Sequence, residues 1–351
     1  RRLSSALQTV PNDARGHPDI IFKVGVPNAS LADAFALVEP TLKPLVASIG
    51  ELVATDVDVP QQAKDAGQHF FRVEGKRFRP TICLLAAAAA NGEANDKQAR
   101  LAQVVEIVHA ASLLHDDVID VADTRRGKAT VHTLFGNKVA VLSGDFLIAR
   151  ANVLVARLGS TEVVRLMGTV FDEMVAGELM QVRASPQDRL EFDHYLSKTY
   201  RKTAALISLG CESVGVLGDH PPAVREALKQ YGRHLGLAYQ LIDDMLDITG
   251  SAEVLGKPAC SDLRQGLATA PALFAHEEFP EMRELIMRSF SHDNDVSQAE
   301  AKIRKSRGLE KTAMLATNHA QLASDALGVL PPSPARDGLL RLLSDVLNRK
   351  A

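Results

Sequence analysis

Apolar residues recur with a helical period along almost the whole chain, from about residue 31 to its end. The segments that interrupt this period are short, such as 91–96 (NGEAND), 184–187 (ASPQ) and 218–222 (GDHPP). No strand-like alternation stands between hairpin signals, and no linker is long enough to separate two domains. Few aromatic residues and many alanines and leucines also favour helices. The sequence therefore predicts an all-α protein whose one large domain covers residues 31–351.

Residues 1–30 differ from this pattern because glycine and proline recur in a polar stretch. We expect an irregular N-terminal segment there. Its first residues, RRLSSALQ, have the arginine and serine content of a transit peptide, although Asp13 and Asp19 follow soon after. One interpretation is therefore that the segment is the remnant of such a peptide.

The charge balance and the cysteines exclude some classes of function. The chain has 40 basic and 43 acidic residues and a net charge of −3, which gives no general basic field for nucleic acid. We therefore expect no nucleic-acid partner, and any anion site must be local. Cys83, Cys211 and Cys260 are scattered without metal-ligand spacing, which favours free thiols in a reducing compartment.

The segment 109–123 places polar residues in a line along an otherwise apolar helix. Their spacing puts them on one helical face, and valine, isoleucine and leucine surround them. They are His109, Ser112, Asp116, Asp120 and Asp123. A polar stripe on an apolar helix predicts a helix that lines an internal, polar-walled cavity. The alternative is an acidic face that meets water, which a single DDxxD motif does not exclude.

A second DDxxD motif occurs in 235–250, where Gln240 stands three residues before Asp243 on the same face of an apolar helix. Two such motifs are hard to explain as two solvated faces. If the helices face each other, their carboxylates converge on hard cations, and magnesium binds few carboxylates and is completed by substrate phosphates. The predicted magnesium ligands are Asp116, Asp117, Asp120, Asp243, Asp244 and Asp247.

Basic residues accompany both motifs. They are Lys76, Arg77, Arg79, Arg125, Arg126, Lys198, Lys202 and Lys257. Any one cluster alone could be a solvated basic patch. Together with the aspartates they predict a metal-bridged polyphosphate at one place and a metal-free anion, held by arginine and lysine, at another.

Five segments, in this order, resemble the signature of a known family. They are GKRFRP (75–80), HAASLLHDDVIDVADTRRG (109–127), KTAAL (202–206), YQLIDDMLD (239–247) and GKPACSDLRQG (256–266). Their order and spacing are similar to those of the trans-prenyltransferases that make polyprenyl diphosphates, over roughly residues 30–350. The whole most resembles the long-chain, solanesyl diphosphate synthase-like subgroup, which supplies quinone side chains. The resemblance implies the isoprenoid-synthase fold, a single large helical bundle around a central cavity.

The resemblance also implies residue roles. Asp116 and Asp120 would hold two of about three magnesium ions, and Asp243, supported by Asp244 and Asp247, would hold the third. The implied isopentenyl diphosphate site consists of Lys76, Arg79, His109 and Arg126. The implied allylic diphosphate contacts are Arg125, Lys202, Thr203, Gln240 and Lys257. For His109 the alternative is a structural role in a helix contact.

The implied reaction is an ionisation, a condensation and an elimination, catalysed by Asp116, Asp120, Asp243, Arg125 and Lys202. Magnesium and the basic residues stabilise charge on the leaving diphosphate, and a dry apolar pocket shields the allylic cation. The double bond of isopentenyl diphosphate then attacks, and a proton is lost. One turn before the aspartates, Ala111 and Ser112 are small and leave room for a growing tail, which predicts a medium-to-long product. The alternative is that they permit close helix packing.

The remaining expectations concern partners and location. The resemblance implies a homodimer, with a heteromer as the alternative, and is compatible with peripheral membrane association. It favours the mitochondrion, with plastid or cytoplasm as alternatives. Two other functions are the alternatives. A terpene cyclase needs one diphosphate only and leaves GKRFRP unexplained, and a non-catalytic partner subunit has no need of two intact aspartate motifs.

Overall fold

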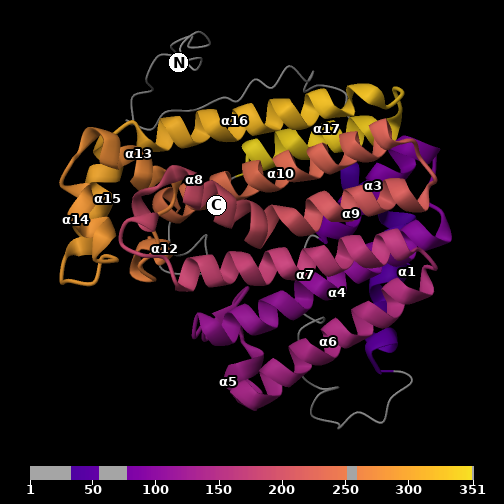
Figure 1. The fold of residues 1–351 in the computed structure, drawn as a ribbon, viewed down its shortest axis with the longest axis horizontal. Helices are drawn as coiled ribbons and strands as arrows, with labels where there is room; N and C mark the ends of the chain where they lie inside the picture. Colours follow the sequence, from indigo (N-terminus) through magenta and orange to yellow (C-terminus); the bar gives the residue numbers. More distant parts are fainter. Residues whose placement is uncertain (1–32, 55–76, 251–258, 350–351) are drawn as a thin grey trace.

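Helices dominate the computed structural model, which describes residues 33–54, 77–250 and 259–349 (Figure 1). The described elements are α1 (Ala34–Ala54), α3 (Phe78–Asn91), α4 (Asp96–Ile119), β1 (Thr124–Arg125), β2 (Lys128–Ala129), α5 (Val131–Phe135), α6 (Asn137–Arg157), α7 (Thr161–Val182), η1 (Asp188–Leu190), α8 (Phe192–Thr199), η2 (Tyr200–Ala204), α9 (Ala205–Leu217), α10 (Pro222–Thr249), α12 (Ser261–Arg264), α13 (Ala270–Glu278), α14 (Met282–Met287), α15 (Asp295–Lys305), α16 (Gly308–Ala326), η3 (Leu327–Val329) and α17 (Pro334–Leu347). The predicted all-α class is confirmed. The predicted segment 1–30, Lys76 and Lys257 lie outside the described residues.

Local signals set where several helices begin. At the start of α4, the Gln98 backbone N–H donates to Asn95 Oδ1 at 2.9 Å, and the Asn95 N–H donates back to Gln98 Oε1 at 3.0 Å. This reciprocal pair is a capping box, which satisfies two N–H groups that the helix leaves open. Pro222 is the first residue of α10, where a missing N–H removes no helical hydrogen bond. The helix that carries the second aspartate motif therefore starts at a well-defined residue.

The long helices pack side by side into one bundle (Figure 1). Helix α10 packs against α9 and α16, α4 packs against α6 and α3, and α7 packs against α9. Helix α9 is apolar around most of its circumference and lies inside the bundle, where other helices cover it. The shorter helices α12 to α15 gather at one end of the bundle (Figure 1).

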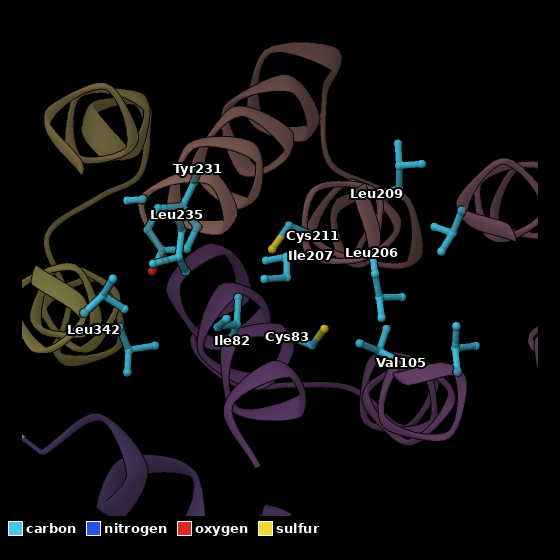
Figure 2. Packing of buried hydrophobic residues seen from close by; sticks show 14 of the residues in the cluster. Ile82, Cys83, Val105, Leu206, Ile207, Leu209, Cys211, Tyr231, Leu235 and Leu342 are labelled. Atoms are coloured by element: carbon cyan, nitrogen blue, oxygen red, sulfur yellow. The ribbon is translucent and has the colours of Figure 1, made fainter. Parts of the chain in front are cut away.

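The hydrophobic core joins the helices that carry the two aspartate motifs. Side chains from several helices meet there (Figure 2), and the labelled ones are Ile82, Cys83, Val105, Leu206, Ile207, Leu209, Cys211, Tyr231, Leu235 and Leu342. Burying each large aliphatic side chain stabilises the fold by roughly 1.5–3 kcal/mol. The Tyr231 hydroxyl donates to the Leu339 carbonyl at 2.9 Å, so its polar end is satisfied inside the core.

A small hairpin, β1 paired with β2, follows the first aspartate motif and was not predicted from the sequence. Its two turn residues, Arg126 and Gly127, have φ values of 51° and 73°. A two-residue turn with positive φ at both positions is a type I′ turn, which matches the twist of the strands. Asn-Gly is the usual signal for this turn, and Arg-Gly between two-residue strands gave no such signal. The hairpin places Arg125 and Arg126 beside the first motif.

The π-helical segment η2 connects α8 to α9 and carries Lys202. Two glycines hold it at close range between α7 and α10. A Cβ atom on Gly177 would lie 2.7 Å from the Lys202 backbone nitrogen, and one on Gly236 would lie 2.7 Å from Ala204 Cα. Both distances are too short for a real side chain, so glycine permits this approach. Single π-helical turns are rare and frequently occur at functional sites.

Candidate active site

Both aspartate motifs lie at the C-terminal ends of their helices. Asp116 is in the last turn of α4, and Asp120 is the residue that caps this helix. Asp243 and the aspartates after it occupy the last two turns of α10. The C-terminal end of a helix carries a partial negative charge, which disfavours carboxylates by roughly 0.3–1 kcal/mol each. Neither motif is placed to stabilise its own helix, and bound cations would offset the unfavourable interaction of the carboxylates with the helix end.

Asp116 and Asp120 share their surroundings with Glu178 and Lys202. Desolvation raises the pKa of Asp116 to about 6; nearby Lys202 opposes the rise, while Glu178 and Asp120 add to it. The pKa of Asp120 is also raised, by desolvation first. Lys202 Nζ lies 2.5 Å from Glu178 Oε2. The three carboxylates of Asp116, Asp120 and Glu178 thus lie near one lysine, Lys202, which already pairs with Glu178. A hard divalent cation would relieve this excess of negative charge.

The carboxylates do not form a ready-made cage for a metal ion. Within the described ranges, no three groups of the histidine, cysteine, aspartate and glutamate types come together closely enough to hold one. Magnesium typically keeps several waters and takes its remaining ligands from substrate phosphates. The observed donors therefore fit an ion that binds together with a diphosphate.

Asp117 faces a different partner from its two neighbours in the motif. It is buried, and its Oδ1 accepts a hydrogen bond from Arg125 Nε at 2.8 Å and forms an ion pair with Arg125 Nη2 at 2.7 Å. The sequence predicted that Asp117 binds the metal and that Arg125 binds the allylic diphosphate. In the structure the two residues bind each other and hold the hairpin against α4.

A second cluster, of arginines around His109, lies at the start of α3 and on the middle of α4. Arg79 Nη1 lies 2.9 Å from His109 Nε2. Arginine offers only donors, so Nε2 is the acceptor, and the neutral ring carries its proton on Nδ1. Burial, followed by the charges of Arg79 and Arg126, lowers the pKa of His109 well below its usual value. His109 therefore stays neutral among cations.

Glu106 is a member of this cluster that sequence analysis missed. Its buried carboxylate lies 2.7 Å from Arg77 Nη1. The available signal was its position three residues before His109, on the same face of α4. Desolvation, then the charges of Arg77 and Arg125, lowers the pKa of Arg126. Crowded guanidinium groups of this kind suit a multiply charged anion.

Asp243 forms an ion pair with the far end of the chain. Arg349 Nη1 donates to Asp243 Oδ1 at 2.6 Å, and the Arg349 guanidinium lies 5.0 Å from the centre of the Tyr239 ring. Both charged side chains are about one-third exposed, at 35% for Asp243 and 37% for Arg349. No sequence pattern linked residues that are 106 positions apart.

Asp244 and Asp247 are buried, and each has protein partners. Asp244 accepts from Gln240 Nε2 at 2.9 Å and from the Tyr195 hydroxyl at 2.5 Å, while burial raises its pKa to about 6. Thr203 Oγ1 donates to Gln240 Oε1 at 3.1 Å, so a chain of hydrogen bonds runs from η2 to α8. Asp247 Oδ2 accepts from the Asp262 N–H at 3.0 Å and holds the start of α12. Sequence analysis missed Tyr195.

The all-α bundle carries a carboxylate cluster, Asp116 with Asp120, and a guanidinium cluster around His109. Residues 60–305 match the family model described as polyprenyl synthetase, and the chain belongs to this family.

Named relatives and a solved structure agree with this assignment. The chain is 45% identical over 337 residues to solanesyl-diphosphate synthase 1, mitochondrial, of Oryza sativa subsp. japonica, which covers 90% of this chain and 78% of the relative. It is 41% identical over 323 residues to the all trans-polyprenyl-diphosphate synthase PDSS1 of Homo sapiens, covering 90% and 75%. A polyprenyl synthase from Caulobacter crescentus, complexed with calcium and isoprenyl diphosphate, superposes with a TM-score of 0.83 at 34% identity, covering 93% of this chain and 100% of that chain.

The predicted family, fold and prenyltransferase class are thereby confirmed. The comparisons favour this class over a terpene cyclase or a non-catalytic partner subunit.

Proposed function

We propose that the chain is a magnesium-dependent synthase that extends an allylic diphosphate with isopentenyl diphosphate to a long all-trans polyprenyl diphosphate. The observation that carries the proposal is the presence of two distinct clusters. One combines Asp116 and Asp120 with Lys202, and the other combines Arg79 and Arg126 with neutral His109. Two diphosphates, one bridged by metal and one held by arginine, match two such clusters.

The metal sites follow from the donors present. Asp116 and Asp120 would hold cations beside Lys202, and Asp243 would hold one on α10, about three magnesium ions in all. Asp117, Asp244 and Asp247 support these sites through their contacts with Arg125, Tyr195 and Asp262. Bound magnesium supplies a positive charge that stabilises the negative charge on a leaving diphosphate.

The protein's own residues position both substrates for the reaction. Lys202, kept charged by Asp116 and Glu178, binds the leaving diphosphate of the allylic substrate, whose C–O bond ionises. Arg79, Arg126 and the Nδ1–H of His109 hold the diphosphate of isopentenyl diphosphate, and its double bond attacks the allylic cation. Loss of a proton to the released diphosphate then completes the new prenyl unit.

The decisive experiment is an assay of the purified protein alone with magnesium, farnesyl diphosphate and labelled isopentenyl diphosphate. We expect elongated products, whose chain length is read by reversed-phase chromatography. If the protein elongates nothing until another subunit is added, it acts as part of a heteromer, and the proposal of a self-sufficient synthase is wrong.

Product length depends on the residues one turn before the first motif. Ala111 is fully buried, and the half-buried Ser112 donates its hydroxyl to the His109 carbonyl at 2.9 Å. We propose that these small side chains leave the path of the growing tail open. The substitution Ala111→Phe should shorten the products by several isoprene units, and an unchanged product length would show that the limit lies elsewhere.

An exposed apolar face supports a homodimer. Helices α6 and α7 expose the large apolar side chains Val141, Leu142, Val153, Val164, Val175, Leu179 and Val182. Among the described helices, α6 is also the one long and apolar enough to cross a membrane, yet it packs on α4 as a helix of the bundle does. A second copy of the chain would cover this face, and light scattering after gel filtration would measure the resulting mass.

The names of the relatives support a location for this enzyme, and the long apolar product supports membrane contact. The rice relative is named mitochondrial, and a relative from Arabidopsis thaliana is named chloroplastic/mitochondrial. We place this enzyme in the mitochondrion, with the plastid as the alternative. Peripheral membrane association fits a product with a long apolar tail, and imaging of a tagged full-length protein tests both statements.

A further inference from the structure

Lys198 lies on α8, one helical turn before Lys202 of the following segment η2. The proposed function gives Lys198 no role. It lines a pocket of about 280 Å³ together with Asp120, Glu178 and Tyr195. This volume is slightly below the ~300–1,000 Å³ typical of sites that enclose a whole ligand. The pocket therefore suits a polar head group better than a complete prenyl chain.

The ammonium group of Lys198 has an unusual environment for a lysine. It lies 5.5 Å from the centre of the Tyr195 ring, and in the described part of the chain no hydrogen bond or ion pair joins it to another residue. Desolvation lowers the pKa of Lys198, and the charge of Lys202 lowers it further. The carboxylates of Asp244, Asp262 and Glu178 raise it. A desolvated ammonium costs free energy unless an anion accompanies it.

The nearby carboxylates are already engaged by other residues. Asp244 accepts from Gln240 and from Tyr195, and Glu178 pairs with Lys202 at 2.5 Å. A diphosphate has enough acceptor oxygens to bind an additional ammonium group, and lysine binds phosphate as a compact point charge. Lys198 also lines the same pocket as Asp120, which is a predicted metal ligand.

The geometry points to Lys198 as a further diphosphate-binding residue, which places an ammonium group on the α8 side of the pocket that Asp120 also lines. This inference rests on the proposed function and identifies an additional contact for the leaving diphosphate. The diphosphate comes either from the bound allylic substrate or from the inorganic diphosphate released after condensation.

The test compares Lys198→Gln with Lys198→Arg and with the control Lys302→Gln. Lys302 also lies 5.5 Å from an aromatic ring, that of Phe279, and its ion partner is Glu281 at 3.3 Å. Because Lys302 does not line the pocket, its variant should behave as the wild type. Calorimetry measures the binding of inorganic diphosphate in magnesium, and steady-state kinetics measures the KM for farnesyl diphosphate.

A lost hydrogen bond to a charged group predicts a weakening of about tenfold to a hundredfold in Lys198→Gln, with partial recovery in Lys198→Arg. A higher KM for farnesyl diphosphate assigns Lys198 to the bound substrate, and weaker inorganic diphosphate binding with unchanged KM assigns it to the product. Binding and KM within twofold of the control overturn the inference. The calorimetric measurement needs no turnover, so an enzyme that fails to elongate farnesyl diphosphate refutes the proposed function separately.

Discussion

Replacing Gly177 with alanine should disturb catalysis more than stability. The new Cβ atom would lie 2.7 Å from the Lys202 nitrogen and 2.9 Å from Arg201 Cβ, whereas ordinary contacts begin at 3.4 Å. Helix α7 and the π-helical segment must therefore separate by about 0.7 Å, the difference between these distances. A misplacement of ~1 Å in an active site can cost about a hundredfold in rate. We expect kcat/KM to fall by roughly tenfold to a hundredfold.

The effect of Gly177→Ala on stability combines two opposing terms. Overpacking costs about 1–3 kcal/mol, while replacing a helical glycine by alanine gains up to ~1 kcal/mol. The free energy of unfolding should therefore fall by about 0–3 kcal/mol, which is less than the ~5–15 kcal/mol that typically separates folded from unfolded protein. Urea unfolding followed by circular dichroism measures it, alongside the kinetics with farnesyl diphosphate.

Gly168 on the same helix is a matched control. A Cβ atom there would meet nothing within 4 Å, so Gly168→Ala should stabilise the protein by ~0.5–1 kcal/mol and leave kcat/KM unchanged. If Gly177→Ala is as active as Gly168→Ala, the close approach of α7 does not position Lys202, and the reasoning is wrong.

The other predictions concern the carboxylates. Because the pKa of Asp116 is raised to about 6, its carboxyl takes up a proton as the pH falls through 6. The magnesium concentration for half-maximal activity should therefore rise about tenfold from pH 7 to pH 5. A half-maximal concentration that does not change with pH would contradict this. In the metal-free protein, the raised pKa of the Asp116 carboxyl means that the free energy of unfolding falls as the pH rises from about 4 to 6. Asp116→Asn should therefore increase the free energy of unfolding at pH 7.5 in EDTA. The same substitution should lower kcat more than a hundredfold. Arg349→Ala removes a cation that competes with magnesium for Asp243, so it should lower the half-saturating magnesium concentration by up to about fivefold. As a control, Arg341→Ala breaks a surface ion pair with Asp345 at 2.7 Å and should leave that concentration unchanged.

The sequence predicted several features of the site because they depend on one helix at a time. The helical period placed Asp116 and Asp120 on one face of α4, and it placed Gln240 beside Asp244, which the 2.9 Å hydrogen bond bears out. The pattern could not predict that Asp117 turns to Arg125, since that contact depends on a hairpin whose Arg-Gly turn lacks the usual signal.

By itself, the sequence determined the all-α class and the two aspartate motifs, because periodicity and spacing act along a single helix. The order of five motifs along the chain carried the resemblance to the family. The tertiary structure alone decided which distant residues meet. Arg77 with Glu106, Tyr195 with Asp244 and Arg349 with Asp243 are separated by 29, 49 and 106 residues. Such pairs depend on how each helix is rotated and where it crosses its neighbours. Core packing sets that geometry, down to the absence of a Cβ atom at Gly177, and a helical period carries no record of it.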